Sequence, residues 1–295
     1  MHLSRLLAPA LLVLALPVAH AQTSVHLGLR LGLNAATRSG TEPVTHPDTG
    51  SGSYPSTSTY SQDYTRSAVL APQFGAVLDV RFGHLALQPA VLFSQKGVDQ
   101  RNHINYSTTY NSPISGISSR VVSEEKYQFT SRPNYVEIPL NVAYTFGDDH
   151  GFQVFGGPYV AFGVGGQVQY EAERQYNYGY GNGQSSGSNY SYGSSFYQFR
   201  DTYPEPTLKQ PNTNNGPTTY STSFGDNSAP SISRRFDAGL NLGVGYRQGP
   251  LQVQLGYGLG LVNQQVAKAS NQREDLTAYY QRVAQLTATY FLKVK

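Results

Sequence analysis

The chain has 295 residues, and its 21 lysines and arginines nearly balance 18 aspartates and glutamates, which leaves a formal net charge of +3. So small a charge gives no argument for a nucleic-acid partner. Charged residues make up only 13% of the chain, against roughly 25% in an ordinary soluble domain. The chain has no cysteine, which excludes a disulfide framework and a lipid-modified cysteine.

The first 21 residues are a predicted signal peptide. Arg5 precedes an apolar run at residues 6–19, and Ala21 closes a small-residue cleavage motif before Gln22. The run is shorter than the roughly 20 residues that span a bilayer as a helix, so we expect cleavage in preference to a membrane anchor. The mature chain, residues 22–295, is then expected to form one domain.

Eight segments of the mature chain alternate in residue type from one position to the next, which is the period of a β-strand. One parity carries leucine, valine and aromatic residues, and the other carries glycine, amides and a few charges. The predicted strands are 25–36, 70–82, 85–97, 135–146, 152–170, two within 234–264 on either side of a turn at Gln248-Gly249, and 283–294. No stretch after the signal approaches the roughly 18 apolar residues of a membrane-spanning helix.

The hairpin at 234–264 shows the two faces most clearly. Large residues such as Leu240, Leu242 and Tyr257 occupy one parity, while the other is mostly glycine and amide. A soluble sandwich would turn charged residues to water instead. A bulky face opposite a small, neutral-polar face is typical of strands that cross a membrane in a barrel.

The connections between the predicted strands alternate strictly between short and long. The short ones are 83–84, 147–151 and 248–249, and the long ones are about 37–69, 98–126, 171–233 and 265–282. Outer-membrane barrels combine short periplasmic turns, long extracellular loops and an even number of strands. The sequence therefore predicts an all-β fold: an eight-stranded antiparallel transmembrane up-and-down β-barrel in the outer membrane, with long extracellular loops and both termini periplasmic. A soluble eight-stranded barrel is the alternative, but nothing in it requires one-sided loops.

Several short motifs lie within these strands. They are Leu87-Gln88-Pro89, Phe93 to Gly97, Tyr135 to Leu140, Gly156 to Tyr159, Gly239 to Tyr246 and Gly256 to Asn263. Together they resemble the outer-membrane β-barrel proteins of Bacteroidota usually labelled PorT-like. The resemblance covers the predicted strands and none of the long loops. It implies residence in the outer membrane, and one branch of the family is associated with type IX secretion and gliding.

Nearly all charges of the predicted strands fall on the inward parity. They are His26, Arg30, Asp79, Arg81, Lys96, Glu137, Asp237 and Arg247. Ionisable groups at membrane depth often mark a function, but the lumen of a small barrel is filled by its own side chains, and mixed signs can pair. We therefore expect a barrel-interior polar network. Phe155, Tyr159 and Phe291 share the inward parity and should fill the lumen further.

No catalytic, cofactor or metal site is predicted. The histidines after the signal show no ligand spacing, and the Gly-x-Gly strings lie within strands and open no helix. Ser-His-Asp groupings carry almost no information in a chain so rich in serine. A membrane-embedded hydrolase or acyltransferase is the least favoured alternative.

Tyrosines recur among glycine, serine, asparagine and glutamine in residues 170–203. Such a composition cannot bury a core and usually gives a disordered or loosely ordered segment, which favours a solvated loop. The same residue types form antibody binding loops, so a contact surface is the other interpretation. The candidate loop contacts are Tyr176, Tyr178, Tyr180, Tyr190, Tyr192 and Tyr197.

The functional prediction is a non-enzymatic outer-membrane β-barrel, structural or surface-binding through its long loops. A component or partner of the type IX secretion and gliding machinery is the alternative. The expected partners are outer-membrane lipid, the barrel-insertion machinery and an envelope protein or surface ligand, with no nucleic acid and no cofactor.

Overall fold

The computed structural model describes residues 23–40, 56–111, 118–147, 150–180, 183–196, 198–199, 232–265 and 278–293. The predicted signal peptide lies outside these residues. In the described part of the chain every regular element is a β-strand, and no helix there could cross a membrane.

The strands differ widely in length. They are β1 (Thr23–Gly40), β2 (Ser56–Ser67), β3 (Val69–Phe82), β4 (Leu85–Gln95), β5 (Val98–Asn111), β6 (Ser118–Phe146), β7 (His150–Tyr180), β8 (Gly183–Phe196), β9 (Gln198–Phe199), β10 (Ile232–Ser233), β11 (Phe236–Gln248), β12 (Leu251–Gly260) and β13 (Tyr279–Lys293). Eleven of them form one large sheet, while β9 and β10 pair separately.

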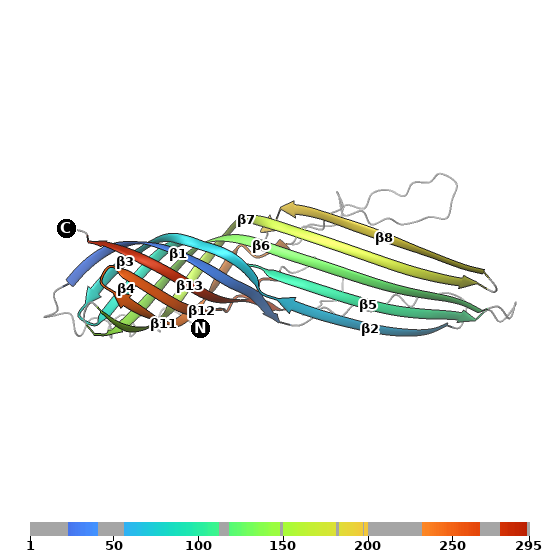
Figure 1. Cartoon of the computed structure of the whole chain (residues 1–295), viewed down its shortest axis with the longest axis horizontal. Coiled ribbons are helices and arrows are strands. Elements are labelled where there is room, and N and C mark those ends of the chain that lie inside the picture. Colours follow the sequence, from blue (N-terminus) through green and yellow to red (C-terminus); the bar gives the residue numbers. More distant parts are fainter. Residues whose placement is uncertain are drawn as a thin grey trace, which may run out of the picture.

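Eight strands of the large sheet pair in a closed ring. From β6 the hydrogen-bonded neighbours are β4, β3, β1, β13, β12, β11 and β7, and β7 pairs with β6 again. All these pairings are antiparallel, which confirms the predicted all-β, antiparallel fold. The ring occupies the left half of Figure 1.

Large apolar side chains point away from the ring. Leu31 and Leu242 are 69% and 65% exposed, whereas Asn241, the neighbour of Leu242 in the chain, is only 3% exposed. The same alternation follows every strand of the ring, so its buried residues are largely polar and its exposed residues largely apolar. This distribution is the reverse of the one found in soluble domains, where charged residues are almost never fully buried.

Tight turns close one end of the ring. Gly83 and Gly249 have φ angles of 61° and 57° in two of the turns, a conformation that glycine adopts without steric cost. The turn between β11 and β12 lies at Gly249-Pro250, one residue beyond the predicted position. The start of β1 and the end of β13 lie at this end too, since Thr23 pairs with Phe82 and Lys293 pairs with His26.

The other end of the ring continues into a single-layer sheet that the sequence analysis did not predict. We call it the extended sheet: β2, β5 and β8 with residues 118–131 of β6 and 167–180 of β7, in the order β2-β5-β6-β7-β8. It forms the right half of Figure 1. The prediction of long loops was therefore wrong for residues 56–67, 98–111, 118–126, 171–180 and 183–196. A sheet with both faces in water needs no alternation of apolar and polar residues, so the pattern that reveals the ring strands is missing here.

A β-bulge marks the change from ring to extended sheet. Tyr135 pairs with Gly163 and Asn134 pairs with Gly165, so that Val164 is an extra residue in β7. The inward residues of β7 are odd-numbered before the bulge, as in buried Tyr159, and even-numbered after it, as in buried Val168. A bulge shifts the side-chain alternation of one strand relative to its partner.

Candidate functional site

Asp79 is the centre of a buried cluster near the tight turns. Its carboxylate accepts a hydrogen bond of 2.8 Å from Nη1 of Arg247 and another of 2.8 Å from Nε2 of Gln88. Nε of Arg81 and Nδ1 of His26 each lie 3.7 Å from Oδ2 of Asp79. These side chains come from β1, β3, β4 and β11, so one carboxylate connects strands from around the ring.

Lys96 is the centre of a second cluster, nearer the extended sheet. Its ammonium lies 3.0 Å from Oε2 of Glu137 and 3.3 Å from Oδ2 of Asp237. The Tyr159 hydroxyl donates a hydrogen bond of 3.1 Å to Oδ2 of Asp237. The ammonium also lies 4.6 Å from the ring centre of Tyr159 and 5.2 Å from that of Tyr135, a favourable cation–π distance.

Arg30 lies inside the ring on β1. It donates hydrogen bonds of 2.9 Å each to Oγ1 of Thr289 and Oε1 of Gln254. Phe291 packs inside as well, with the Arg247 guanidinium 4.7 Å from its ring centre. Side chains therefore fill the interior of the ring over much of its length.

All eight residues of the predicted interior network lie on the inner side of the ring. Seven are buried, and the His26 side chain is 19% exposed. Most of them gather around Asp79 or around Lys96, and Arg30 lies between Thr289 and Gln254. Gln88 and Gln254 also have the inward parity and contact Asp79 and Arg30, but they were not among the predicted residues of the interior network.

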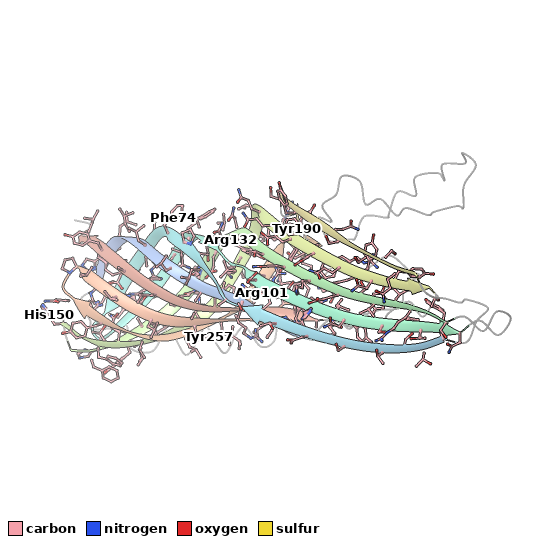
Figure 2. The ribbon with its side chains drawn as sticks, turned by 45° about the vertical axis from the view of Figure 1, so that its right-hand side comes forward. Phe74, Arg101, Arg132, His150, Tyr190 and Tyr257 are labelled. Atoms are coloured by element: carbon pink, nitrogen blue, oxygen red, sulfur yellow. The ribbon has the colours of Figure 1, made fainter. Side chains whose placement is uncertain are left out.

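Strand register gives the extended sheet two chemically different faces. The face continuous with the ring interior carries Tyr60, Tyr64, Tyr106, Tyr110, Tyr127, Phe129, Tyr170, Tyr176 and Tyr178. We call this the tyrosine face. The opposite face carries Asp63, Asp99, Arg101, His103, Arg120, Glu124, Lys126, Glu171 and Glu173. We call this the charged face, and Figure 2 shows side chains on both sides of the sheet.

The candidate loop tyrosines do not form one group. Tyr176 and Tyr178 belong to the tyrosine face, whereas Tyr190 and Tyr192 lie on the charged face, opposite Glu173 and Glu171. Two further candidates remain. Tyr180 is the last residue of β7, and Tyr197 lies outside the described residues. Residues 170–180 and 183–196 are strand and not the expected solvated loop.

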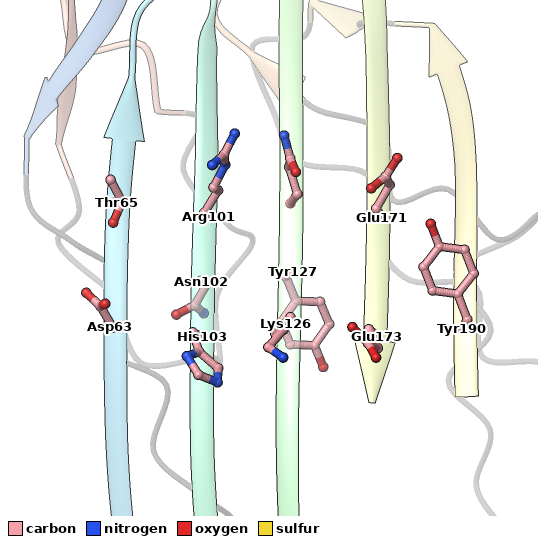
Figure 3. A pocket seen from close by; sticks show the side chains of 11 residues that line it. Asp63, Thr65, Arg101, Asn102, His103, Lys126, Tyr127, Glu171, Glu173 and Tyr190 are labelled. Carbon is pink, nitrogen blue, oxygen red and sulfur yellow. The ribbon is translucent and has the colours of Figure 1, made fainter. Parts of the chain in front are cut away.

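The charged face contains an open depression of about 420 Å³. One row across its lining, from β2 to β8, is Asp63, His103, Lys126, Glu173 and Tyr190 (Figure 3). Two carboxylates, Asp63 and Glu173, lie on either side of the two basic side chains His103 and Lys126 in this row, so opposite charges are close together. Among the described residues no group of three His, Asp or Glu side chains could hold a metal ion.

Glu124 lies on the same face of the extended sheet and is paired twice. Its Oε1 lies 2.9 Å from the Lys126 ammonium and 2.8 Å from Nε2 of His103. Hydrogen bonds from Lys126 and His103 hold the pKa of the Glu124 carboxyl below its usual value. The pairing of Glu124 and Lys126 also raises the pKa of Lys126. Both groups are therefore charged at neutral pH, and neither is tuned for proton transfer.

Charged side chains on the tyrosine face also form ion pairs and hydrogen bonds with their neighbours. Arg174 makes an ion pair of 2.9 Å with Glu125 and donates a hydrogen bond of 3.3 Å to the Tyr106 hydroxyl. The Tyr127 hydroxyl donates a hydrogen bond of 2.6 Å to Glu125. Burial, together with this hydrogen bond, raises the pKa of Tyr127 to about 12, so the phenol stays neutral and acts as a donor.

The sequence matches the model of one protein family. The model of a family described as "Outer membrane protein beta-barrel domain" matches residues 20–264. No curated protein matches the sequence.

Similar solved structures include three bacterial transport proteins. The toluene transporter TbuX of Ralstonia pickettii is 8% identical, with 90% of this chain and 89% of that chain covered and a TM-score of 0.19. The outer membrane channel DcaP of Acinetobacter baumannii is 9% identical, with coverage of 93% and 98% and a TM-score of 0.20. The toluene transporter TodX of Pseudomonas putida is 6% identical, with coverage of 91% and 89% and a TM-score of 0.20. These likenesses are too slight to bear on function.

Proposed function

Because the chain belongs to the family of outer membrane proteins with a β-barrel domain, we propose that its ring of strands crosses the outer membrane as an eight-stranded up-and-down β-barrel. The observation that carries the proposal is the reversed distribution of side chains, with leucines exposed outside the ring and ion pairs buried within it. A closed ring also pairs its backbone groups internally, which lipid requires of every spanning structure.

The barrel serves to hold the extended sheet outside the cell as a binding surface, without chemistry and without transport. Eight strands enclose a space only wide enough for side chains, and Phe155, Tyr159 and Phe291 are buried in it. The extended sheet, in contrast, presents tyrosine rings such as Tyr178 and Tyr192 to solvent on its two faces.

The orientation of the barrel follows from its two ends. Outer-membrane barrels have their short turns in the periplasm, and here the tight turns lie at the same end as the start of β1 and the end of β13. We therefore place both termini in the periplasm and the extended sheet on the cell surface. Cleavage of the signal peptide before Gln22 belongs to the same proposal.

The narrower resemblance to PorT-like proteins of Bacteroidota stays a prediction, because it rests on strand motifs alone. A role in type IX secretion or gliding would require this protein to associate with other proteins of the cell envelope. Co-purification from mildly solubilised membranes, followed by identification of attached proteins, would test it.

The natural absence of cysteine permits a direct test of orientation. Tyr192→Cys places a thiol on β8, where the native side chain is 75% exposed, and His84→Cys places one at a tight turn. A membrane-impermeant maleimide should label residue 192 on intact cells and residue 84 only after the outer membrane is permeabilised. The unsubstituted chain, which has no thiol, gives the background.

The reverse labelling order would contradict the orientation. Recovery of the mature chain as a soluble monomer without detergent would contradict the membrane-spanning barrel itself.

A further inference from the structure

The tyrosine face combines aromatic pairs with aromatic side chains that lie beside small residues. Tyr60 lies directly opposite Tyr106 on β5, and the next two residues of this row are Ser123 and Tyr176. The Tyr176 ring lies over Gly187 on β8, so close that a Cβ at Gly187 would meet its hydroxyl oxygen at 2.3 Å. The Tyr176 ring therefore spreads over its small neighbour, whereas Tyr60 and Tyr106 form an adjacent aromatic pair.

Tyrosine rings on this face remain open to solvent. Tyr127, Tyr176 and Tyr178 are 41%, 38% and 41% exposed. The aliphatic residue Ile104, in contrast, is only 6% exposed, because neighbouring side chains cover it. What the face offers to a ligand is therefore aromatic rings and hydroxyl groups, with little exposed aliphatic surface.

The tyrosine face has little net charge. Among its described side chains the ionic groups are Arg66, Glu125 and Arg174. Glu125 and Arg174 neutralise each other, and the Arg66 guanidinium stacks 5.0 Å from the ring centre of Tyr64. Amide groups such as those of Gln62 and Asn102, which are hydrogen-bonded to each other at 2.9 Å, supply the other polar atoms.

We propose that the tyrosine face binds a neutral, linear polysaccharide. A sugar ring presents a C–H face, which packs on an aromatic ring, and a rim of hydroxyl groups, which pair with amides and phenols. An uncharged ligand matches a face with almost no net charge. A nucleic acid would need a row of cations to neutralise its phosphates. Tyrosine is also enriched at protein interfaces, so capture of a protein is a separate outcome of the experiment.

The dimensions of the face suit a chain and not a single sugar. β5 has 14 residues, which at about 3.3 Å each gives a surface of roughly 45 Å. The inference rests on the proposed function, because it needs the extended sheet to lie outside the cell, where polysaccharides are accessible.

Two double variants separate the two faces. Tyr106→Ala with Tyr176→Ala removes rings from the tyrosine face, while Tyr190→Ala with Tyr192→Ala removes rings from the charged face of the same sheet. The full mature chain, folded in detergent micelles, is assayed against a panel of neutral glucans, mannans and galactans, with anionic alginate for comparison. We expect binding of at least one neutral polysaccharide, weakened about tenfold or more in the first variant, equal to ~1.4 kcal/mol, and unchanged in the second.

A gel-mobility difference between unheated and boiled samples shows that each barrel is folded. Tyr106→Phe, which keeps the ring, should retain most of the binding and so separates stacking from damage to the sheet. No binding to any neutral polysaccharide, a preference for alginate, equal losses in the two double variants, or capture of a protein alone would overturn the inference. Cysteine labelling at residue 192 is independent of these outcomes, so failure here is distinguishable from failure of the proposed barrel.

Discussion

Asp79 and Glu137 are both buried acids of the barrel interior, but their loss should have different costs. Asp79→Asn takes the carboxylate from Arg247, Arg81 and His26 together. Removing one partner of a buried ion pair costs about 3–5 kcal/mol, and we expect a value in this range. Glu137→Gln should cost about 1–2 kcal/mol, because Lys96 keeps Asp237 at 3.3 Å. Urea unfolding in detergent micelles measures both.

A lipid-facing substitution provides the control for these two variants. Leu242 points outward and is 65% exposed, so Leu242→Val removes one methylene at a cost of about 0.8 kcal/mol or less. If Asp79→Asn costs no more than this, the Asp79 cluster is in water and its ion pairs contribute little.

The sequence located the interior charges but not their partners. Residue parity decides which side of a strand a group occupies, and it placed Lys96, Glu137 and Asp237 on the same side. It does not give the height of a residue along the barrel, which depends on the stagger between neighbouring strands. Lys96 and Asp237 are 141 positions apart, and only the closed ring brings them together.

At the level of single elements, the bulge accommodates Val164 as one extra residue of β7. Deleting Val164 should remove the bulge and leave the rest of β7 in its present register, because Gly163 and Gly165 already pair with the consecutive residues Tyr135 and Asn134. Ser123 of β6 should therefore still face Tyr176. Cysteine pairs joined by a short bis-maleimide reveal this: 123 with 176 should cross-link both in the full chain and in the deletion variant.

The pair 123 with 177 serves as the control, because these two side chains should lie on opposite faces in both chains. Cross-linking of residues 123 and 177 after deletion of Val164, with loss of the link between 123 and 176, would show that Val164 is not the extra residue.

The sequence predicted the ring strands and missed the strands of the extended sheet, for one physical reason. Lipid outside and a packed interior inside force two residue classes onto the two sides of a ring strand. In the extended sheet both sides meet water, so serine, threonine and glutamine occupy either side. The signal that remained is tyrosine at every second position, as in Tyr176, Tyr178 and Tyr180, because tyrosine favours strands.

For the whole molecule, we predict that the protein does not conduct ions. Phe155, Tyr159 and Phe291 are at most 9% exposed inside the barrel, and an eight-stranded barrel has no room for a water channel beside such side chains. Purified protein in planar bilayers should therefore give no steady current. Samples that show the gel-mobility difference on heating are the ones to test. Uniform, long-lived current steps from these samples would contradict the prediction.

The arrangement of the ring strands could be predicted from the sequence, because spanning a membrane limits their residue pattern and their length. The even number of segments and the one-sided long connections follow from the sequence, because hairpins need only a few residues at the turn end. The joining of three long connections into one sheet was not predictable, since it depends on pairings between segments far apart, such as β2 with β5 and β7 with β8.

β6 and β7 run for 29 and 31 residues, from the turn end of the barrel to the far end of the extended sheet. A pull on the tip of either strand is therefore carried along its covalent backbone directly into the barrel wall. A pull on the edge strands β2 and β8 is different, because each is attached to the sheet on one side only among the described residues. Such a force acts in shear on a whole row of hydrogen bonds, 14 paired positions in β8, which share the load instead of breaking one after another. Anchorage of the extended sheet thus depends on the direction of the load, and it is greatest along the strands.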